Sequence, residues 1–254
     1  MMELTILGSG TGVPSPRRGS PGALVRASGG TILVDCGPGS LRVAAAAGVD
    51  PASIDGVLLT HFHPDHVLDL PALLFALRNP AFAGRGPLTV AGPEGTVKLI
   101  DHWFSAAYGA WLRPVGFDLT VLEFSPGEHV LAGVRATAFP VKHAPESLAY
   151  RVREADGEAV LAISGDTGLC AGIVEAGRDA DLLLLECAFP DPAPWDGHLT
   201  PRTAAEVAAL SAPRRLVLTH FYPEVEREPI EAVVAERYAG PVERAEDGAT
   251  YRIR

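Results

Sequence analysis

Cysteine is scarce in this sequence, and long apolar runs are absent. The three cysteines, Cys36, Cys170 and Cys187, are scattered and never form a C-x-x-C pair, which argues against a disulfide framework. No apolar run approaches the length that a bilayer span needs, and the N-terminus lacks a basic region followed by a long apolar stretch. We therefore expect a cytoplasmic protein that makes no contact with a membrane.

Basic charge is also scarce. Because 21 lysine and arginine residues stand against 31 aspartate and glutamate residues, the formal net charge is -10 at pH 7. The surface therefore has no broad basic field, and a nucleic-acid partner would need a local basic patch. This charge weakly disfavours structured RNA as a substrate.

The rest of the composition is that of an ordinary globular chain. Of the 254 residues, 47% are hydrophobic and 20% are charged, and a chain of this length can bury a large core. No internal repeat, low-complexity tract or linker divides it. The sequence therefore predicts one domain that spans residues 1–254.

Predicted strands and helices mix along the chain as in an α/β protein. In the first part, strands are predicted at 3–7, 23–26, 31–35, 57–59 and 88–90, and helices at 39–47, 67–78 and 94–108. Five β-rich runs follow at 117–124, 129–131, 134–139, 148–152 and 159–163, and the last part alternates helices at 171–176, 201–211 and 229–237 with strands at 182–185, 216–218 and 249–253. These strands are too apolar for a face in contact with water. We therefore expect two facing sheets with helices outside both, a four-layer αβ/βα sandwich.

The densest group of chemically active side chains is His61-Phe62-His63-Pro64-Asp65-His66, directly after the apolar run 56–59. Four potential metal ligands, three histidines and an aspartate, stand within six residues at the end of a predicted strand. Imidazole nitrogens and carboxylates suit zinc and related metals. The motif therefore predicts a metal site.

Three further potential ligands lie far along the chain in a matching context. His143, Asp166 and His220 each follow an apolar strand, at the point where the strand meets a loop. An α/β scaffold usually builds its site from loops at one edge of rigid strands. Each residue alone could be structural, but together with the first motif they predict one cluster.

Seven ligands are too many for one tetrahedral ion and predict two divalent ions, with Zn²⁺ expected and Mn²⁺ or Fe²⁺ as alternatives. The two expected groups, joined by a bridging Asp166, are His61, His63 and His143 for one ion and Asp65, His66 and His220 for the other. A hydroxide between the ions would serve as nucleophile, and Asp65 could orient it or accept its proton. Asp35 is a candidate partner for the second nitrogen of a ligating histidine.

Further motifs carry a resemblance to a known family. They are 7–14 (Leu-Gly-Ser-Gly-Thr-Gly-Val-Pro), 35–37 (Asp-Cys-Gly), 66–74, which contains Leu-Pro-x-Leu-Leu, and 218–221 (Leu-Thr-His-Phe). Together with the metal motifs, they resemble the ribonuclease Z-like branch of the metallo-β-lactamase superfamily over essentially the whole chain. The resemblance implies the metallo-β-lactamase fold and a phosphodiester as the substrate class. Because members of this branch are often dimers, it also implies that a homodimer could form.

The same resemblance points to two residues beside the metals, Glu186 and His198. We expect His198 to act as general acid toward the leaving oxygen, with Glu186 orienting the imidazole and keeping it protonated. The alternative is that His198 only caps the helix that begins near Thr200.

Two departures separate the chain from the tRNA-processing members of this branch. The loop after Asp-Cys-Gly reads Pro-Gly-Ser-Leu (38–41), where those members carry a Glu and then Thr-Gln. Only 23 positions separate His143 from Asp166, which leaves no room for the arm that grasps tRNA.

The sequence therefore predicts a binuclear metal-dependent hydrolase, a phosphodiesterase that acts on a small or cyclic phosphodiester through a metal-bridging hydroxide. The alternatives are a tRNA 3′-processing endoribonuclease and a thioester or lactone hydrolase of the same fold. A non-enzymatic metal-binding module is disfavoured, because structural zinc sites use four ligands and leave no open position.

Overall fold

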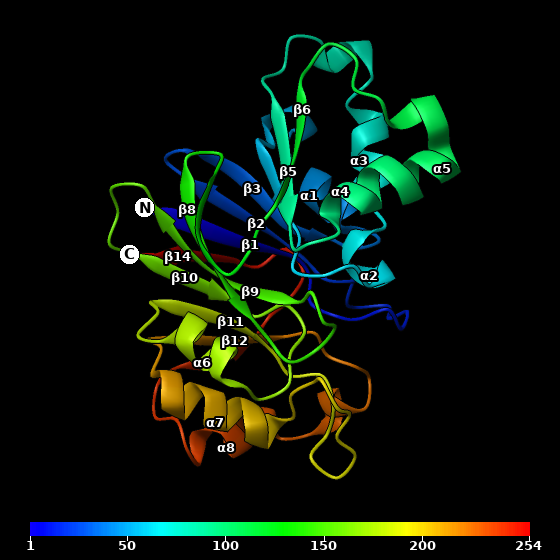
Figure 1. Ribbon diagram of the computed structural model, residues 1–254. Coiled ribbons are helices and arrows are strands. Elements are labelled where there is room, and N and C mark those ends of the chain that lie inside the picture. The colour runs from blue at the N-terminus through cyan, green and yellow to red at the C-terminus, as the bar shows by residue number, and fades with distance from the viewer.

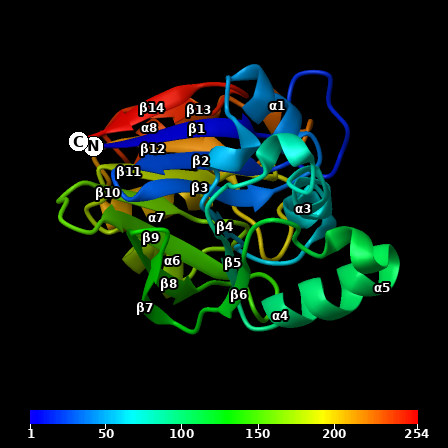
Figure 2. The ribbon, with the colours of Figure 1, turned by 90° about the horizontal axis from the view of Figure 1, so that it is seen from above.

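Two seven-stranded sheets face each other in the computed structural model, which describes residues 1–254 (Figure 1). In spatial order, the first sheet comprises β14 (Thr250–Ile253), β1 (Met2–Gly8), β2 (Gly22–Ala27), β3 (Gly30–Cys36), β4 (Gly56–Leu58), β5 (Leu88–Gly92) and β6 (Leu119–Glu123). The second comprises β13 (Val242–Arg244), β12 (Leu216–Thr219), β11 (Leu182–Glu186), β10 (Val160–Ile163), β9 (Leu148–Glu154), β8 (Val134–Pro140) and β7 (Gly127–Leu131). Figure 2 shows the two chain ends side by side, because β1 and β14 pair antiparallel with Met2 opposite Ile253.

Helices cover the outer face of each sheet (Figure 1). Those on the first sheet are α1 (Ser40–Ala46), α2 (Pro64–Val67), α3 (Leu70–Ala76) and α4 (Thr96–Lys98), and α5 (Ser105–Tyr108) extends this layer beyond the sheet. Those on the second sheet are α6 (Ala171–Gly177), α7 (Pro201–Ser211) and α8 (Ile230–Ala235). No helix combines the length and the apolar character that a membrane span requires.

The alternation of side chains along a strand explains the four layers. In β11, Leu182 and Leu184 point into the core between the sheets, whereas Leu183 and Leu185 pack under the helices of the second sheet. Successive side chains of a strand point to opposite faces, so a strand with apolar residues on both faces must be covered on both. The predicted four-layer αβ/βα sandwich is confirmed.

Two predicted helices need correction. The helix expected at 67–78 is α3, which begins only at Leu70 and ends at Ala76, because Pro71 cannot donate a backbone hydrogen bond and belongs in the first turn of a helix; the separate short helix α2 ends at Val67. Between them, the Asp69 carboxylate accepts hydrogen bonds from backbone N–H groups of the loop that begins α1. The helix expected at 94–108 contains a π-helical stretch, Leu99–Phe104, between α4 and α5.

One strand was missed, β13. Its three residues, Val-Glu-Arg, are too few and too polar to stand out in a sequence. It forms because β12 offers a parallel partner, with Leu216 opposite Val242 and Leu218 opposite Arg244. Long-range pairing, rather than local preference, decides this strand.

The fold brings the predicted ligands to one edge of the sandwich. His61 follows β4, His143 follows β8, Asp166 follows β10 and His220 follows β12. The four strands come from both sheets, so the site lies where the two sheets meet.

Candidate metal centre

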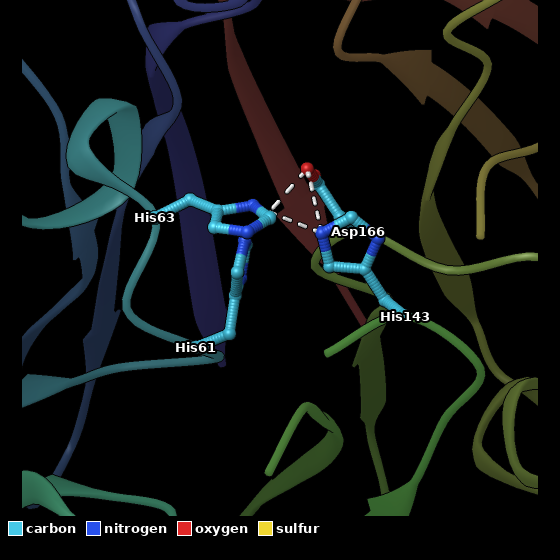
Figure 3. A group of neighbouring side chains, drawn as sticks. All are labelled: His61, His63, His143 and Asp166. Atoms are coloured by element: carbon cyan, nitrogen blue, oxygen red, sulfur yellow. Dashed lines mark hydrogen bonds and ion pairs between the residues drawn. The ribbon is translucent and has the colours of Figure 1, made fainter. Parts of the chain in front are cut away.

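The structure brings all seven expected ligand residues together. Their possible ligand atoms lie within 4.8 Å of one another in two groups, of which the first, shown in Figure 3, is His61, His63, His143 and Asp166. The second is Asp65, His66 and His220. These are the two groups expected from the sequence.

Asp166 stands between the groups, with one carboxylate oxygen toward each. Its Oδ1 lies 3.3 Å from His66 Nε2 and 3.2 Å from His220 Nε2. Its Oδ2 lies 3.8 Å from the Nε2 atoms of both His61 and His143. This orientation suits a carboxylate that bridges two ions.

The residues fit divalent cations. The Nε2 atoms of His61, His66 and His220 and the Oδ1 of Asp166 are buried, and none has a hydrogen-bond partner in the protein. Burying unpaired polar atoms is costly, yet here four of them converge on the same small space. Coordination of a cation satisfies imidazole nitrogens and a carboxylate together, and this donor set is that of zinc and related metals.

Asp35 holds two of the histidines, His66 directly and His61 through Thr60. It accepts a hydrogen bond of 2.8 Å from His66 Nδ1 and another of 2.8 Å from Thr60 Oγ1. Since the Thr60 hydroxyl donates to Asp35, its oxygen accepts from His61 Nδ1 at 3.0 Å. Both histidines therefore carry their proton on Nδ1 and present a free Nε2 lone pair to the centre.

The two outer histidines are held differently. His143 donates from Nδ1 to the Gly197 carbonyl at 3.0 Å, so its Nε2 faces the centre. His63 is exposed and presents Nδ1 instead, which lies 3.0 Å from His143 Nε2. The rim of the site at His63 is therefore the side open to solvent.

Backbone geometry explains two glycines and one strained residue. A Cβ on Gly37 would lie 2.0 Å from the Asp65 carbonyl oxygen, so only glycine lets the Asp-Cys-Gly loop pass the metal motif. Gly165 has φ 57° and faces Thr60, where a Cβ would come within 2.7 Å. His220 itself has φ 60°, an unfavourable conformation that functional sites retain when the surrounding packing enforces it.

Two pKa shifts favour the ligand forms. The pKa of His61 lies well below its usual range, because burial and the neighbouring His66 disfavour a charged imidazole. Burial alone would raise the pKa of Asp166, but His220 and His66 outweigh it and hold the pKa well below its usual range. A neutral imidazole and an ionised carboxylate are the forms that bind a cation.

Glu186 and His198 form a hydrogen-bonded pair beside the second group. His198 Nδ1 donates to Glu186 Oε1 at 2.8 Å, and the carboxylate is fully buried. Burial alone would lower the pKa of His198, but the hydrogen bond to Glu186 and its charge outweigh burial and raise it. Thr200, not His198, caps α7, through a reciprocal pair with Thr203. The helix-cap interpretation of His198 is therefore wrong.

Sequence reasoning missed three aromatic residues at the rim, Phe189, Trp195 and Tyr222. The rings of Phe189 and Tyr222 are stacked with centroids 4.6 Å apart, and those of Phe189 and Trp195 with centroids 6.1 Å apart. Their only local signal is the proline-rich loop that contains Trp195. Their meeting depends on the distant β11 and β12, after which they lie.

Comparisons with known proteins agree with this geometry. A family described as "Beta-lactamase superfamily domain" matches residues 30–221. The chain is 34% identical to a ribonuclease Z of Mycolicibacterium paratuberculosis over 276 aligned positions, which cover 97% of this chain and 96% of the relative. Among solved structures, the metallo-β-lactamase fold protein YhfI from Bacillus subtilis is 23% identical, with a TM-score of 0.84 and 98% of each chain covered. The short form of human tRNase Z is 26% identical, with a TM-score of 0.76 and 99% of each chain covered.

The fold and the site define a metal-dependent hydrolase built on two facing sheets. Because the family match spans most of the chain and the ribonuclease Z relative spans nearly all of it, the chain belongs to the metallo-β-lactamase superfamily, in its ribonuclease Z-like branch. The expected family, fold and class of enzyme are confirmed, and in this family the site uses divalent metal ions.

Proposed function

We propose that this hydrolase cleaves small phosphodiesters at a binuclear centre. The observation that carries the proposal is the position of His198 beside the two ligand groups. Its ring nitrogen lies within 4.8 Å of the nearest ligand atoms of Asp166 and His220, and its Nδ1 is fixed by the buried Glu186. Hydrolysis of a phosphodiester needs both an activated water and a proton for the basic leaving oxygen. The two ligand groups serve the first need and His198 the second.

The roles of the side chains follow from their positions. Two divalent ions in the ligand groups would neutralise charge on the phosphoryl oxygens and make water acidic enough to attack at neutral pH. Asp65, whose Oδ2 lies 3.7 Å from His220 Nε2, is placed to orient the water and accept its proton. His198 gives its proton to the leaving oxygen as the phosphorus–oxygen bond breaks. One water is consumed, and a phosphomonoester and an alcohol are formed.

The short connections around the site support a small substrate. Between His143 and Asp166 the chain forms only β9, a turn at 155–159 and β10. The 276 positions aligned with the ribonuclease Z relative outnumber the 254 residues of this chain, so the relative has segments that this chain lacks. The net charge of -10 also disfavours a substrate that must be bound through many phosphates.

Precursor tRNA is the second candidate substrate. It is favoured by the relatives, since the M. paratuberculosis protein is named ribonuclease Z and the human structure is a tRNase Z. The two candidates differ in size more than in chemistry, because both are phosphodiesters cleaved by water. Substrate size is therefore the property to measure.

The test is a substrate panel run with metal-loaded protein. It contains bis(p-nitrophenyl) phosphate, cyclic nucleotides, precursor tRNA, a β-lactam and a glutathione thioester, with Asp166→Asn as the inactive control. We expect diesterase activity that exceeds hydrolysis of the β-lactam and the thioester, and poor cleavage of precursor tRNA. Efficient cleavage at the 3′ end of the acceptor stem would establish the second candidate. Thioester hydrolysis without diesterase activity would overturn the proposal.

A further inference from the structure

Three aromatic rings line one side of the metal site, and we call Phe189, Trp195 and Tyr222 the aromatic wall. Phe189 stacks with each of the other two rings, since its plane differs by 24° from that of Trp195 and by 26° from that of Tyr222. Tyr222 lies two residues after the expected ligand His220, and their ring centroids are 5.9 Å apart. The aromatic wall therefore begins at the metal site and extends outward.

The outer end of the aromatic wall is open. Trp195 is 65% exposed, so most of its indole surface is available for contact. A single exposed tryptophan is ordinary on a protein surface. This one, however, is continuous with a stacked pair of rings that reaches the candidate metal centre.

The loop that carries Trp195 is held in place. It contains Pro190, Pro192 and Pro194, and prolines restrict the backbone. At its end, Asp196 pairs with Lys142 Nζ at 2.5 Å, and the Gly197 carbonyl accepts the hydrogen bond from His143. The loop of the aromatic wall is thus joined to Lys142 and His143. Because the loop is already ordered, binding a molecule on the aromatic wall costs little conformational entropy.

The aromatic wall lies on the side of the leaving group. The His198 ring is 5.3 Å from Phe189 and 6.5 Å from Tyr222, centroid to centroid. If His198 protonates the leaving oxygen, the group attached to that oxygen is directed toward the aromatic wall. A nucleobase stacks on an aromatic side chain through the face of its ring, whichever hydrogen-bonding groups its edge carries.

We propose that the aromatic wall stacks a nucleobase carried on the leaving side of the phosphodiester, an inference that rests on the proposed function. The substrate class is then a small nucleoside phosphodiester. A longer strand fits less well, because the nearby cations already pair with carboxylates: Lys142 with Asp196, and Arg17 and Arg18 with Glu226.

A matched pair of substrates tests the proposal. Adenosine 2′,3′-cyclic phosphate and the 2′,3′-cyclic phosphate of methyl riboside share the reacting ring, in which the ribose carries the leaving oxygen, and only the adenosine compound has a base on that ribose. We expect the wild type to prefer the adenosine compound in kcat/KM. Trp195→Ala should raise KM for the adenosine compound on the order of 10-fold and leave the methyl riboside compound unchanged, and Trp195→Phe should retain most of the preference. Trp103→Ala, at another half-exposed tryptophan, should change neither substrate.

Binding gives a second measurement that does not need turnover. Trp103, Trp111 and Trp195 are the three tryptophans of the chain, so a variant with Trp103→Phe and Trp111→Phe reports on Trp195 alone. Adenosine monophosphate should quench its fluorescence, and ribose phosphate should not.

The outcomes separate the two proposals. Equal hydrolysis of both substrates, unaffected by Trp195→Ala, would overturn the nucleobase proposal and leave the phosphodiesterase proposal standing. No hydrolysis of either substrate or of bis(p-nitrophenyl) phosphate, with quenching by adenosine monophosphate intact, would overturn the phosphodiesterase proposal and keep the aromatic wall as a nucleotide-binding surface. No quenching and no base preference would overturn the role of the aromatic wall outright.

Discussion

Replacing Glu186 with glutamine removes the negative charge beside His198 and disturbs a carboxylate whose two oxygens each accept two hydrogen bonds. Oε1 accepts hydrogen bonds of 2.8 Å from both Thr167 N and His198 Nδ1. Oε2 accepts bonds of 3.2 Å from Ala188 N and 3.0 Å from Leu199 N. Glutamine has one oxygen and one NH₂ group. If the NH₂ group replaces Oε2, the N–H groups of Ala188 and Leu199 both lose their acceptor. If it replaces Oε1, the Thr167 N–H loses its acceptor, and His198 keeps this contact only with its proton on Nε2.

The size of the effect follows from these four contacts. A buried donor left without its acceptor costs about 1–3 kcal/mol, so the loss of one or two acceptors should lower the free energy of unfolding by about 1–6 kcal/mol. The activity should change as well. Glu186 raises the pKa of His198 against the opposing effect of burial, so the variant should lower this pKa. A general acid works only while protonated, and the alkaline limb of kcat/KM should therefore move to lower pH.

Two measurements check this prediction on metal-loaded protein. Chemical denaturation gives the loss of stability, and the pH profile on a substrate with an alkyl leaving group gives the shift of the alkaline limb. Glu175→Gln is the control, because Glu175 pairs with Arg178 on the exposed surface and its loss should change neither measurement. An unchanged alkaline limb in a folded, metal-replete Glu186→Gln variant would refute the role of the pair.

Three further predictions concern the general acid His198, the carboxylate of Asp35 and the number of metal ions. His198→Ala should keep its metal and lose on the order of 10² to 10⁴ in rate on a poor leaving group, but much less on a nitrophenyl ester; equal losses on both would show that His198 positions substrate instead. Asp35→Asn should weaken metal binding about 10- to 100-fold in a chelator competition, because His66 and Thr60 lose a charged acceptor; unchanged affinity would mean that these contacts are only structural. Elemental analysis of reconstituted protein should approach two equivalents of metal per chain, and full activity at a saturating single equivalent would rule out a bridge at Asp166.

The candidate metal centre was the easiest part to predict. Four of its expected ligand residues stand within six positions of each other, and His143, Asp166 and His220 each follow an apolar strand. Strand ends that point toward one edge bring such residues together whatever the details of packing. The helix boundaries near 68 and around 99–104 were harder, because a local break competes with a pattern that continues through it.

Local patterns were enough to predict the layers and the residues of the candidate centre, because the two-residue alternation of apolar side chains and the histidine motif both stand in the sequence. Three features became visible only in the folded chain: how Asp166 divides its oxygens between the two groups, that Thr60 links His61 to Asp35, and that Trp195 joins the aromatic wall. These features depend on contacts between segments far apart in the chain. Local sequence patterns do not predict which of these side chains come into contact, because the packing of the two sheets sets the distances between them.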